Sequence, residues 1–228
     1  MNNSLNKLQF VRQRIENACK SAHRQVEEVT LLAVSKRHPA INVLHMNELG
    51  LSAFGENQVT EALQKQKELR HVDLQWHFIG AIQSNKTRDI AEHFQWVQSI
   101  DRVKVLRRLS RQRPASMGPL NICLQVNIDG EQQKSGATEQ EIMHLAVLAE
   151  ELDNIKLRGL MAIPKLTGDP RQQHDSFRKV RILFEQLRQA GHQLDTLSMG
   201  MSADLEIAIA EGSTMVRVGT DLMGSRET

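Results

Sequence analysis

The sequence is informative first for what it lacks. Its 228 residues include no tyrosine and only two cysteines. The absence of tyrosine excludes any mechanism in which a phenol of this chain acts as an acid or a base. Cys19 and Cys123 lie far apart in apolar surroundings, which predicts two buried thiols rather than a disulfide framework. Free thiols favour a reducing compartment, so we expect a cytoplasmic protein.

Charge and hydropathy patterns exclude further classes. No apolar run approaches the ~20 residues of a membrane span, and the polar first residues are unlike a signal peptide. The 29 basic and 27 acidic residues nearly cancel, without a basic tract that would indicate nucleic-acid binding. The nine histidines are scattered, and no Cys/His cluster has metal-ligand spacing. We therefore expect no membrane, nucleic-acid or metal partner.

Apolar runs alternate with helical patterns along the whole chain. A leading helix is indicated by apolar residues with a 3.6-residue period, namely Leu5, Leu8, Val11, Ile15 and Ala18. Eight later runs predict strands at residues 29–35, 51–54, 74–79, 96–100, 120–128, 156–163, 196–199 and 215–219. The clearest helical patterns between them are 141–152 and 172–190. We predict one α/β domain over residues 1–228, a (βα)8 TIM-like barrel with an extra N-terminal helix; an open doubly wound sheet is the alternative.

Two turns rich in small residues near the end of the chain predict a phosphate site. Each adjoins a short apolar run, in LSMGMS at 197–202 and in GSTMVRVGT at 212–220. Small residues let the backbone approach a ligand closely, and unpaired N–H groups at the start of a helix favour an anion. We expect Ser202, Gly219 and Thr220 to hold a phosphate dianion.

Arg217 is the one charged residue in the last strand run. It alternates with Val216 and Val218, so its side chain points into the barrel if the valines pack against helices. A buried guanidinium needs an acceptor, because an unpaired buried charge is very costly. The candidate acceptors are a phosphate oxygen, a pyridine nitrogen and a structural salt bridge.

Lys36 follows the first strand run, at the barrel end where chemistry is expected. A desolvated lysine amine becomes partly neutral and can form a Schiff base with an aldehyde; the alternative is a solvated strand-end lysine. Combined with the phosphate turns, the amine indicates a phosphorylated aldehyde. Pyridoxal 5'-phosphate (PLP) and a sugar phosphate on a class I aldolase are the two candidates. Lys134, in QQKSG at 132–136, is a weaker second amine.

Two further polar residues lie near strand ends. Asn57 follows the second strand run and would hydrogen-bond either a ring hydroxyl of the ligand or its own turn. His77, in the third run, would be either a general base or a core histidine with satisfied hydrogen bonds.

Seven motifs occur in order between Leu31 and Gly224: AVSK at 33–36, FGEN at 54–57, WHFIG at 76–80, QSNK at 83–86, GLMAI at 159–163, and the segments 197–202 and 212–220. Together they resemble the pyridoxal phosphate homeostasis protein family. The resemblance implies a PLP-binding barrel similar to the N-terminal domain of alanine racemase, with Lys36 as the Schiff-base lysine. By motif position, Ser202, Gly219 and Thr220 would hold the phosphate, and Arg217 would contact the ring nitrogen or the phosphate. With Asn57 and His77, these residues make up the expected cofactor site.

The resemblance also implies a role rather than a reaction. The family acts as a carrier or buffer of PLP in vitamin B6 and amino-acid balance, without established turnover, and apo PLP-dependent enzymes are the implied partners. We expect a monomer. The alternatives are a PLP-dependent racemase and a Schiff-base aldolase. Racemisation of the alanine racemase type pairs a lysine with a tyrosine, which this chain lacks, and the aldolase would need an acid–base pair near Lys36.

The sequence departs from the family pattern in three places. Gln58 replaces an aromatic residue after FGEN, Arg37 and His38 follow Lys36 in place of commoner residues, and Asp221 opens a segment that is usually apolar. A carboxylate beside a phosphate dianion costs about 0.3–1 kcal/mol when solvated. Asp221 therefore predicts somewhat weaker PLP binding.

Overall fold

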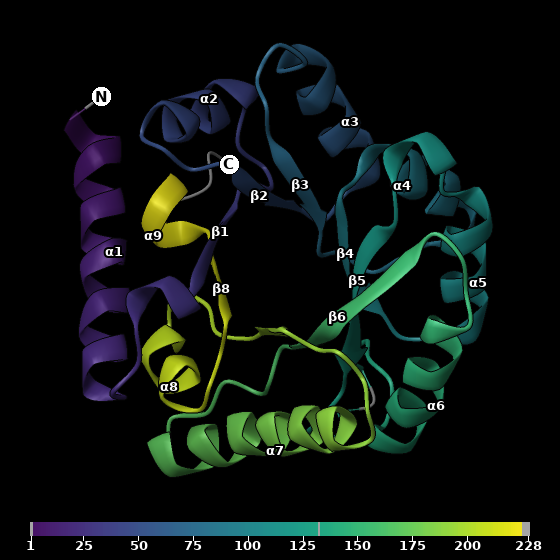
Figure 1. The fold of residues 1–228 in the computed structure, drawn as a ribbon. Helices are drawn as coiled ribbons and strands as arrows, with labels where there is room; N and C mark the ends of the chain where they lie inside the picture. The colour runs from purple at the N-terminus through teal and green to yellow at the C-terminus, as the bar shows by residue number, and fades with distance from the viewer. Residues whose placement is uncertain (1, 132, 225–228) are drawn as a thin grey trace.

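The computed structural model describes residues 2–131 and 133–224 and contains a closed barrel of parallel strands. Each strand pairs with its neighbours in the sequence, and the last strand pairs with the first (Figure 1). The predicted (βα)8 barrel is confirmed and the open doubly wound sheet is excluded. The strands are β1 (Thr30–Val34), β2 (Ala53–Glu56), β3 (Gln75–Phe78), β4 (Trp96–Ile100), β5 (Leu120–Val126), β6 (Ile155–Ala162), β7 (Thr196–Ser198) and β8 (Met215–Val218).

Helices surround the barrel, and the first lies beside the last two (Figure 1). The predicted leading helix is α1 (Asn2–Ser21), which buries Leu8, Val11 and Ile15 but leaves Leu5 exposed. It packs on α8 (Leu205–Ala210) and α9 (Thr220–Met223). The others are α2 (Ala40–Glu48), α3 (Val59–Glu68), α4 (Thr87–His93), α5 (Val103–Gln112), α6 (Glu139–Glu150) and α7 (Pro170–Gln189).

Capping residues explain why two helices begin earlier than the hydrophobic pattern predicts. Thr138 and Glu141 form a capping box at the start of α6, in which each side chain bonds the other residue's backbone N–H. Asp169 caps α7 through the N–H of Arg171, and Pro170 occupies the first helical position. These polar first turns satisfy unpaired N–H groups and carry none of the apolar periodicity.

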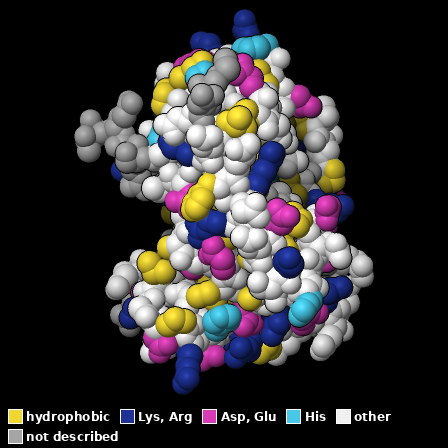
Figure 2. Space-filling model, turned by 90° about the vertical axis from the view of Figure 1, so that its left-hand side faces the viewer, with side chains coloured by type: hydrophobic (Ala, Val, Ile, Leu, Met, Phe, Trp, Pro, Cys, Tyr) yellow, Lys and Arg dark blue, Asp and Glu magenta, His cyan; other side chains and the backbone are white. Residues whose placement is uncertain are grey.

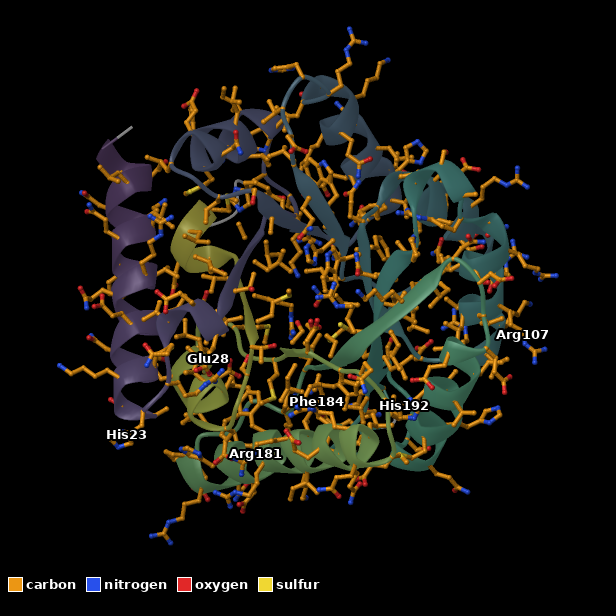
Figure 3. All side chains as sticks on the ribbon, in the orientation of Figure 1. His23, Glu28, Arg107, Arg181, Phe184 and His192 are labelled. Carbon is orange, nitrogen blue, oxygen red and sulfur yellow. The ribbon has the colours of Figure 1, made fainter. Side chains whose placement is uncertain are left out.

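The apolar core lies between the barrel and its helices. Val216 and Val218 of β8 are buried there together with Phe177 and Phe184 of α7. Figure 3 shows Phe184 on the side of α7 that faces the barrel, whereas Arg107 on α5 points outward. The barrel interior holds a separate, more polar set of side chains, and this set leads to the functional site.

Several predicted absences can be compared with the described residues. Cys19 and Cys123 are buried free cysteines, as predicted, and Trp96 and Met161 pack with Cys123 inside the barrel. Within residues 2–131 and 133–224, no helix has the length and apolar character to cross a bilayer, and no His/Cys/Asp/Glu group could hold a metal ion. On the side shown in Figure 2, basic and acidic side chains are intermixed.

Candidate functional site

A cavity of about 600 Å³ opens where the strands end. This is the carboxyl end of the barrel, the face on which barrel enzymes bind their ligands. Six of the seven predicted cofactor residues line the cavity: Lys36, Asn57, Ser202, Arg217, Gly219 and Thr220. The structure therefore brings together residues that lie within or after β1, β2, β7 and β8. These residues range from Lys36 to Thr220 along the sequence.

Lys36 lies directly after β1, and a buried ionic network lies behind it. The hydroxyl of the preceding Ser35 donates to Glu56 Oε1 at 2.6 Å. From α3, Lys65 Nζ donates at 2.7 Å to three acceptors: the Ser35 carbonyl, Glu56 Oε1 and Glu61 Oε1. The network fixes the backbone from which the half-buried Lys36 side chain reaches the cavity.

Glu56 is the buried carboxylate of this network and, like Ser35, has no exposed surface. Burial raises the pKa of its carboxyl, while Lys65 and Ser35 act in the opposite direction. Its second oxygen, Oε2, has no hydrogen-bond partner among the described residues. On the other side of Lys36, Arg37 adopts a φ of 63°, and its N–H donates to Glu61 Oε1 at 2.5 Å. This bond stabilises a left-handed backbone conformation that residues other than glycine rarely adopt.

Asn57 follows β2 and lines the cavity, and its side-chain oxygen Oδ1 is buried. Its Oδ1 is without a hydrogen-bond partner in the described structure. The backbone of Asn57 is held close to Gly80, where a Cβ would lie 2.2 Å from the Asn57 carbonyl oxygen. Only glycine permits this approach. Because the side-chain oxygen is not used by its own turn, it suits a hydroxyl donor on a ligand ring.

Arg217 lies inside the barrel with 4% of its surface exposed. Its Nη1 donates to the Ser198 carbonyl at 2.7 Å and to the Ser198 hydroxyl at 2.8 Å, and its Nη2 donates to the Ala162 carbonyl at 2.9 Å. Its acceptors are thus neutral oxygens rather than a salt-bridge carboxylate. Burial lowers the pKa of Arg217 to about 10, which leaves the group charged at neutral pH. The inward direction predicted from Val216 and Val218 is confirmed.

A chain of hydrogen bonds continues from Arg217 through the barrel interior. Ser198 Oγ donates to Gln98 Oε1 at 2.7 Å, and Gln98 Nε2 donates to His77 Nδ1 at 2.9 Å. His77 Nε2 then donates to Gln75 Oε1 at 3.0 Å. Gln75 is exposed at the start of β3, so the chain crosses the barrel from the cavity to the opposite face.

His77 belongs to this interior chain and does not line the cavity. It pairs with Trp96, the first residue of β4, and their rings stack with centroids 5.1 Å apart. Burial lowers the pKa of His77 to about 3, so the imidazole is neutral. The structure does not place His77 at the cofactor site and agrees with the alternative of a core histidine whose hydrogen bonds are satisfied.

The first small-residue turn, at 197–202, is held in place by residues on both of its sides. Within the first turn Gly200 adopts a φ of 95°, and a Cβ there would lie 2.5 Å from Ala208 Cβ. The buried Asp204 accepts the N–H of Met201 at 2.7 Å, and burial raises the pKa of this carboxyl. From outside, Arg14 of α1 donates to the Ser202 carbonyl. Ser202 is therefore fixed on both sides of its turn.

The positions that depart from the family pattern lie in different environments. Gln58 is exposed and does not line the cavity, whereas His38 does. Lys134, the weaker second amine, also lines the cavity and forms an ion pair with Glu131. The Asp221 carboxylate lies 2.5 Å from Arg14 Nη1, which supplies a cation that the sequence pattern alone did not reveal.

Sequence reasoning missed several supporting residues. Glu61 and Lys65 have the i, i+4 spacing of a helical ion pair, which was a usable signal for part of the network behind Lys36. Gln98 and Ser198 are single polar residues within apolar strand runs. Only the two-residue alternation along a strand indicates that their side chains face the barrel interior. Arg14 had no local signal, because its partners lie 188 to 207 residues away.

Comparison with known proteins identifies the class to which this barrel belongs. Residues 9–227 match the family described as the N-terminal domain of alanine racemase. The alanine racemase of Clostridium difficile shares the fold, with a TM-score of 0.76 at 14% identity over 97% of this chain and 56% of that one. At this identity the likeness shows the fold alone.

More similar relatives narrow the class. Proteins named pyridoxal phosphate homeostasis protein are 54% identical in Pseudomonas aeruginosa, over 94% of this chain and 92% of the relative, and 45% identical in Escherichia coli, over 100% and 98%. The structure of PipY from Synechococcus elongatus, solved with PLP bound, matches with a TM-score of 0.81 and 36% identity, over 92% of this chain and 100% of that one. The chain belongs to the pyridoxal phosphate homeostasis protein family.

Proposed function

We propose that this protein binds PLP through Lys36 and acts in the cytoplasm as a carrier or buffer of the cofactor. The observation that carries the proposal is the convergence of one amine, one buried cation and two small-residue turns on a single cavity of about 600 Å³. That volume is in the usual range for small-molecule sites. PLP bound in a relative of the same family supports the same ligand.

The residues present fit PLP group by group. Lys36 would bond the aldehyde carbon, and the turns at Ser202 and at Gly219–Thr220 would receive the phosphate. The buried Asn57 Oδ1, which lacks a partner in the described structure, would accept from the ring hydroxyl. Arg217 would face the pyridine nitrogen, and its two contacts with Ser198 hold it in that direction. When bound, PLP would supply an electron-withdrawing ring, and a permanent cation at its nitrogen disfavours protonation there.

We propose a carrier rather than a racemase because no suitable base is found for the face of the PLP ring opposite Lys36. Fast racemisation needs a base on each face of a planar carbanion. The sequence has no tyrosine, and His77 was the substitute that the sequence suggested. With a pKa of about 3 and no access to the cavity, His77 cannot fill that role. Apo PLP-dependent enzymes are the proposed recipients of the cofactor, and the protein is proposed to act as a monomer.

Borohydride trapping tests the proposal directly. The protein is incubated with PLP, reduced with borohydride, digested and analysed by mass spectrometry. We expect the pyridoxyl mass on the peptide that contains Lys36 in the wild type, and its loss from that peptide in Lys36→Met. Lys134→Met is the matched control, since Lys134 lines the same cavity and should leave labelling of Lys36 intact. A label only on Lys134, or no label at all, would refute the assignment.

A further inference from the structure

Arg14 of α1 hydrogen-bonds Ser202 in the first turn of the phosphate site and Asp221 next to the second turn. Its Nη2 donates to the Ser202 carbonyl at 2.8 Å, and its Nη1 donates to Asp221 Oδ2 at 2.5 Å. Its Nε and Nη2 also donate to the two oxygens of Glu206, at 2.6 and 2.8 Å. The side chain is only 20% exposed. Its position is therefore set by four hydrogen bonds to three residues.

These contacts add to the bonds that already join two neighbouring segments, such as the one from the Arg217 N–H to the Gly200 carbonyl at 2.9 Å. Ser202 lies between β7 and α8, whereas Asp221 follows Thr220 in the first turn of α9. Ser202 and Thr220 both line the cavity. A planar guanidinium that bonds the backbone of one turn and a side chain of the other restrains the distance between them, and Arg geometry suits such a fork.

The same contacts alter the electrostatics of the site. Asp221 places a carboxylate directly beside Thr220, where a phosphate dianion would be repelled. Arg14 pairs with that carboxylate at 2.5 Å, and both side chains are largely shielded from solvent, with 20% and 25% exposed. Partial burial strengthens the pairing relative to a fully solvated ion pair. Arg14 shares its single positive charge with Glu206, so it offsets part of the unfavourable charge that Asp221 brings to the site.

We propose that Arg14 is a positioning residue of the phosphate site, which restrains the two turns and compensates the charge of Asp221. It thereby sets the preference of the cavity for a phosphorylated ligand over its unphosphorylated analogue. The inference rests on the proposed PLP function. It assigns to the N-terminal helix a part in ligand selection, although α1 contributes no residue to the cavity wall among those described.

The test compares dissociation constants for PLP and for pyridoxal, which lacks the phosphate, in the wild type and in four variants. Arg14→Met should weaken PLP binding about tenfold and leave pyridoxal binding within about twofold of wild type. Arg24→Met is the matched control. Arg24 lies just after α1 with 15% of its side chain exposed, and it donates to the Ile209 and Ser213 carbonyls rather than to Ser202 or Asp221. It should lower the melting temperature without changing the ratio of the two dissociation constants.

Asp221→Asn separates charge compensation from a purely structural role. In the wild-type background it should tighten PLP binding about two- to threefold. In the Arg14→Met background the gain should be larger, because the carboxylate there has lost its cation. This rescue requires an electrostatic effect on the ligand, since removing Asp221 restores none of the contacts of Arg14. If Arg14→Met fails to fold, Arg14→Lys replaces it. Lysine keeps the charge but lacks the planar guanidinium that bonds both segments, so affinity should fall less than in Arg14→Met, and only for PLP.

Two failures are distinguishable. Equal binding of PLP and pyridoxal by the wild type would refute the phosphate site, and this inference with it. A wild type that prefers PLP, combined with equal losses for both ligands in Arg14→Met or with no gain from Asp221→Asn in either background, would refute the role of Arg14 alone.

Discussion

Lys65→Met probes the network behind Lys36 most directly. Lys65 is 5% exposed, and its ammonium donates three hydrogen bonds of 2.7 Å, two of them to carboxylates. Methionine fills a similar volume but leaves Glu56 buried without a cation. Breaking a buried ion pair by removing one partner costs about 3–5 kcal/mol. For a chain of this size that loss lowers the melting temperature by roughly 6–20 °C.

The loss should depend on pH in a defined direction. Burial already raises the pKa of Glu56, and removing Lys65 removes an opposing influence, so the pKa rises further in the variant. The folded variant then binds more protons than the unfolded chain, and its stability falls as pH rises through the raised pKa. The deficit relative to wild type should therefore be largest in neutral solution and shrink as pH is lowered toward the ordinary glutamate pKa of ~4.3.

Denaturant unfolding at several pH values measures this effect. Lys67→Met is the matched control, because Lys67 is exposed on the same helix and should change stability by no more than about 0.5 kcal/mol. Adding Glu56→Gln to Lys65→Met removes the unpaired charge and should recover much of the loss in neutral solution. A Lys65→Met deficit as small as that of Lys67→Met, or one independent of pH, would contradict this account.

Two further predictions concern the barrel interior and the reaction. Gln98→Leu leaves both the Ser198 hydroxyl and His77 Nδ1 without their buried partner, so it should destabilise the protein by about 1–3 kcal/mol per group in urea unfolding; an unchanged unfolding midpoint would show that the interior chain contributes little. With L-alanine in deuterated water, PLP-loaded protein should show no D-alanine formation approaching 1 s⁻¹, and enzyme-like racemisation would require a second base that the carrier proposal does not provide.

The sequence predicted the barrel because its signal was repeated. Eight apolar runs at similar spacing, separated by helical patterns, leave few other arrangements. Individual boundaries were less certain. The second strand was predicted at residues 51–54 but covers Ala53–Glu56, since glycine and glutamate after Phe54 resemble a turn. Glu56 can continue a buried strand because Lys65 neutralises it, and that partner lies on the following helix.

The site residues divide in a similar way. Lys36, Arg217 and the two turns were predictable because strand ends in a barrel all point to one face. His77 shows the limit of this reasoning. Alternation along a strand indicates that a side chain faces the barrel interior, but its depth depends on the stagger between neighbouring strands. His77 pairs with the first residue of β4 and lies two residues before Ile79, which lines the cavity, so its side chain is buried beneath the cavity floor.

Closure of the ring has a consequence for how the protein is made. β1 forms its ladder with β8, and Arg14 bonds residues as far along the chain as Asp221. A growing polypeptide that has not yet reached these residues has neither a closed barrel nor the second phosphate turn. Cofactor binding therefore cannot assist the early stages of synthesis. It can stabilise only chains in which the first strand has already paired with the last.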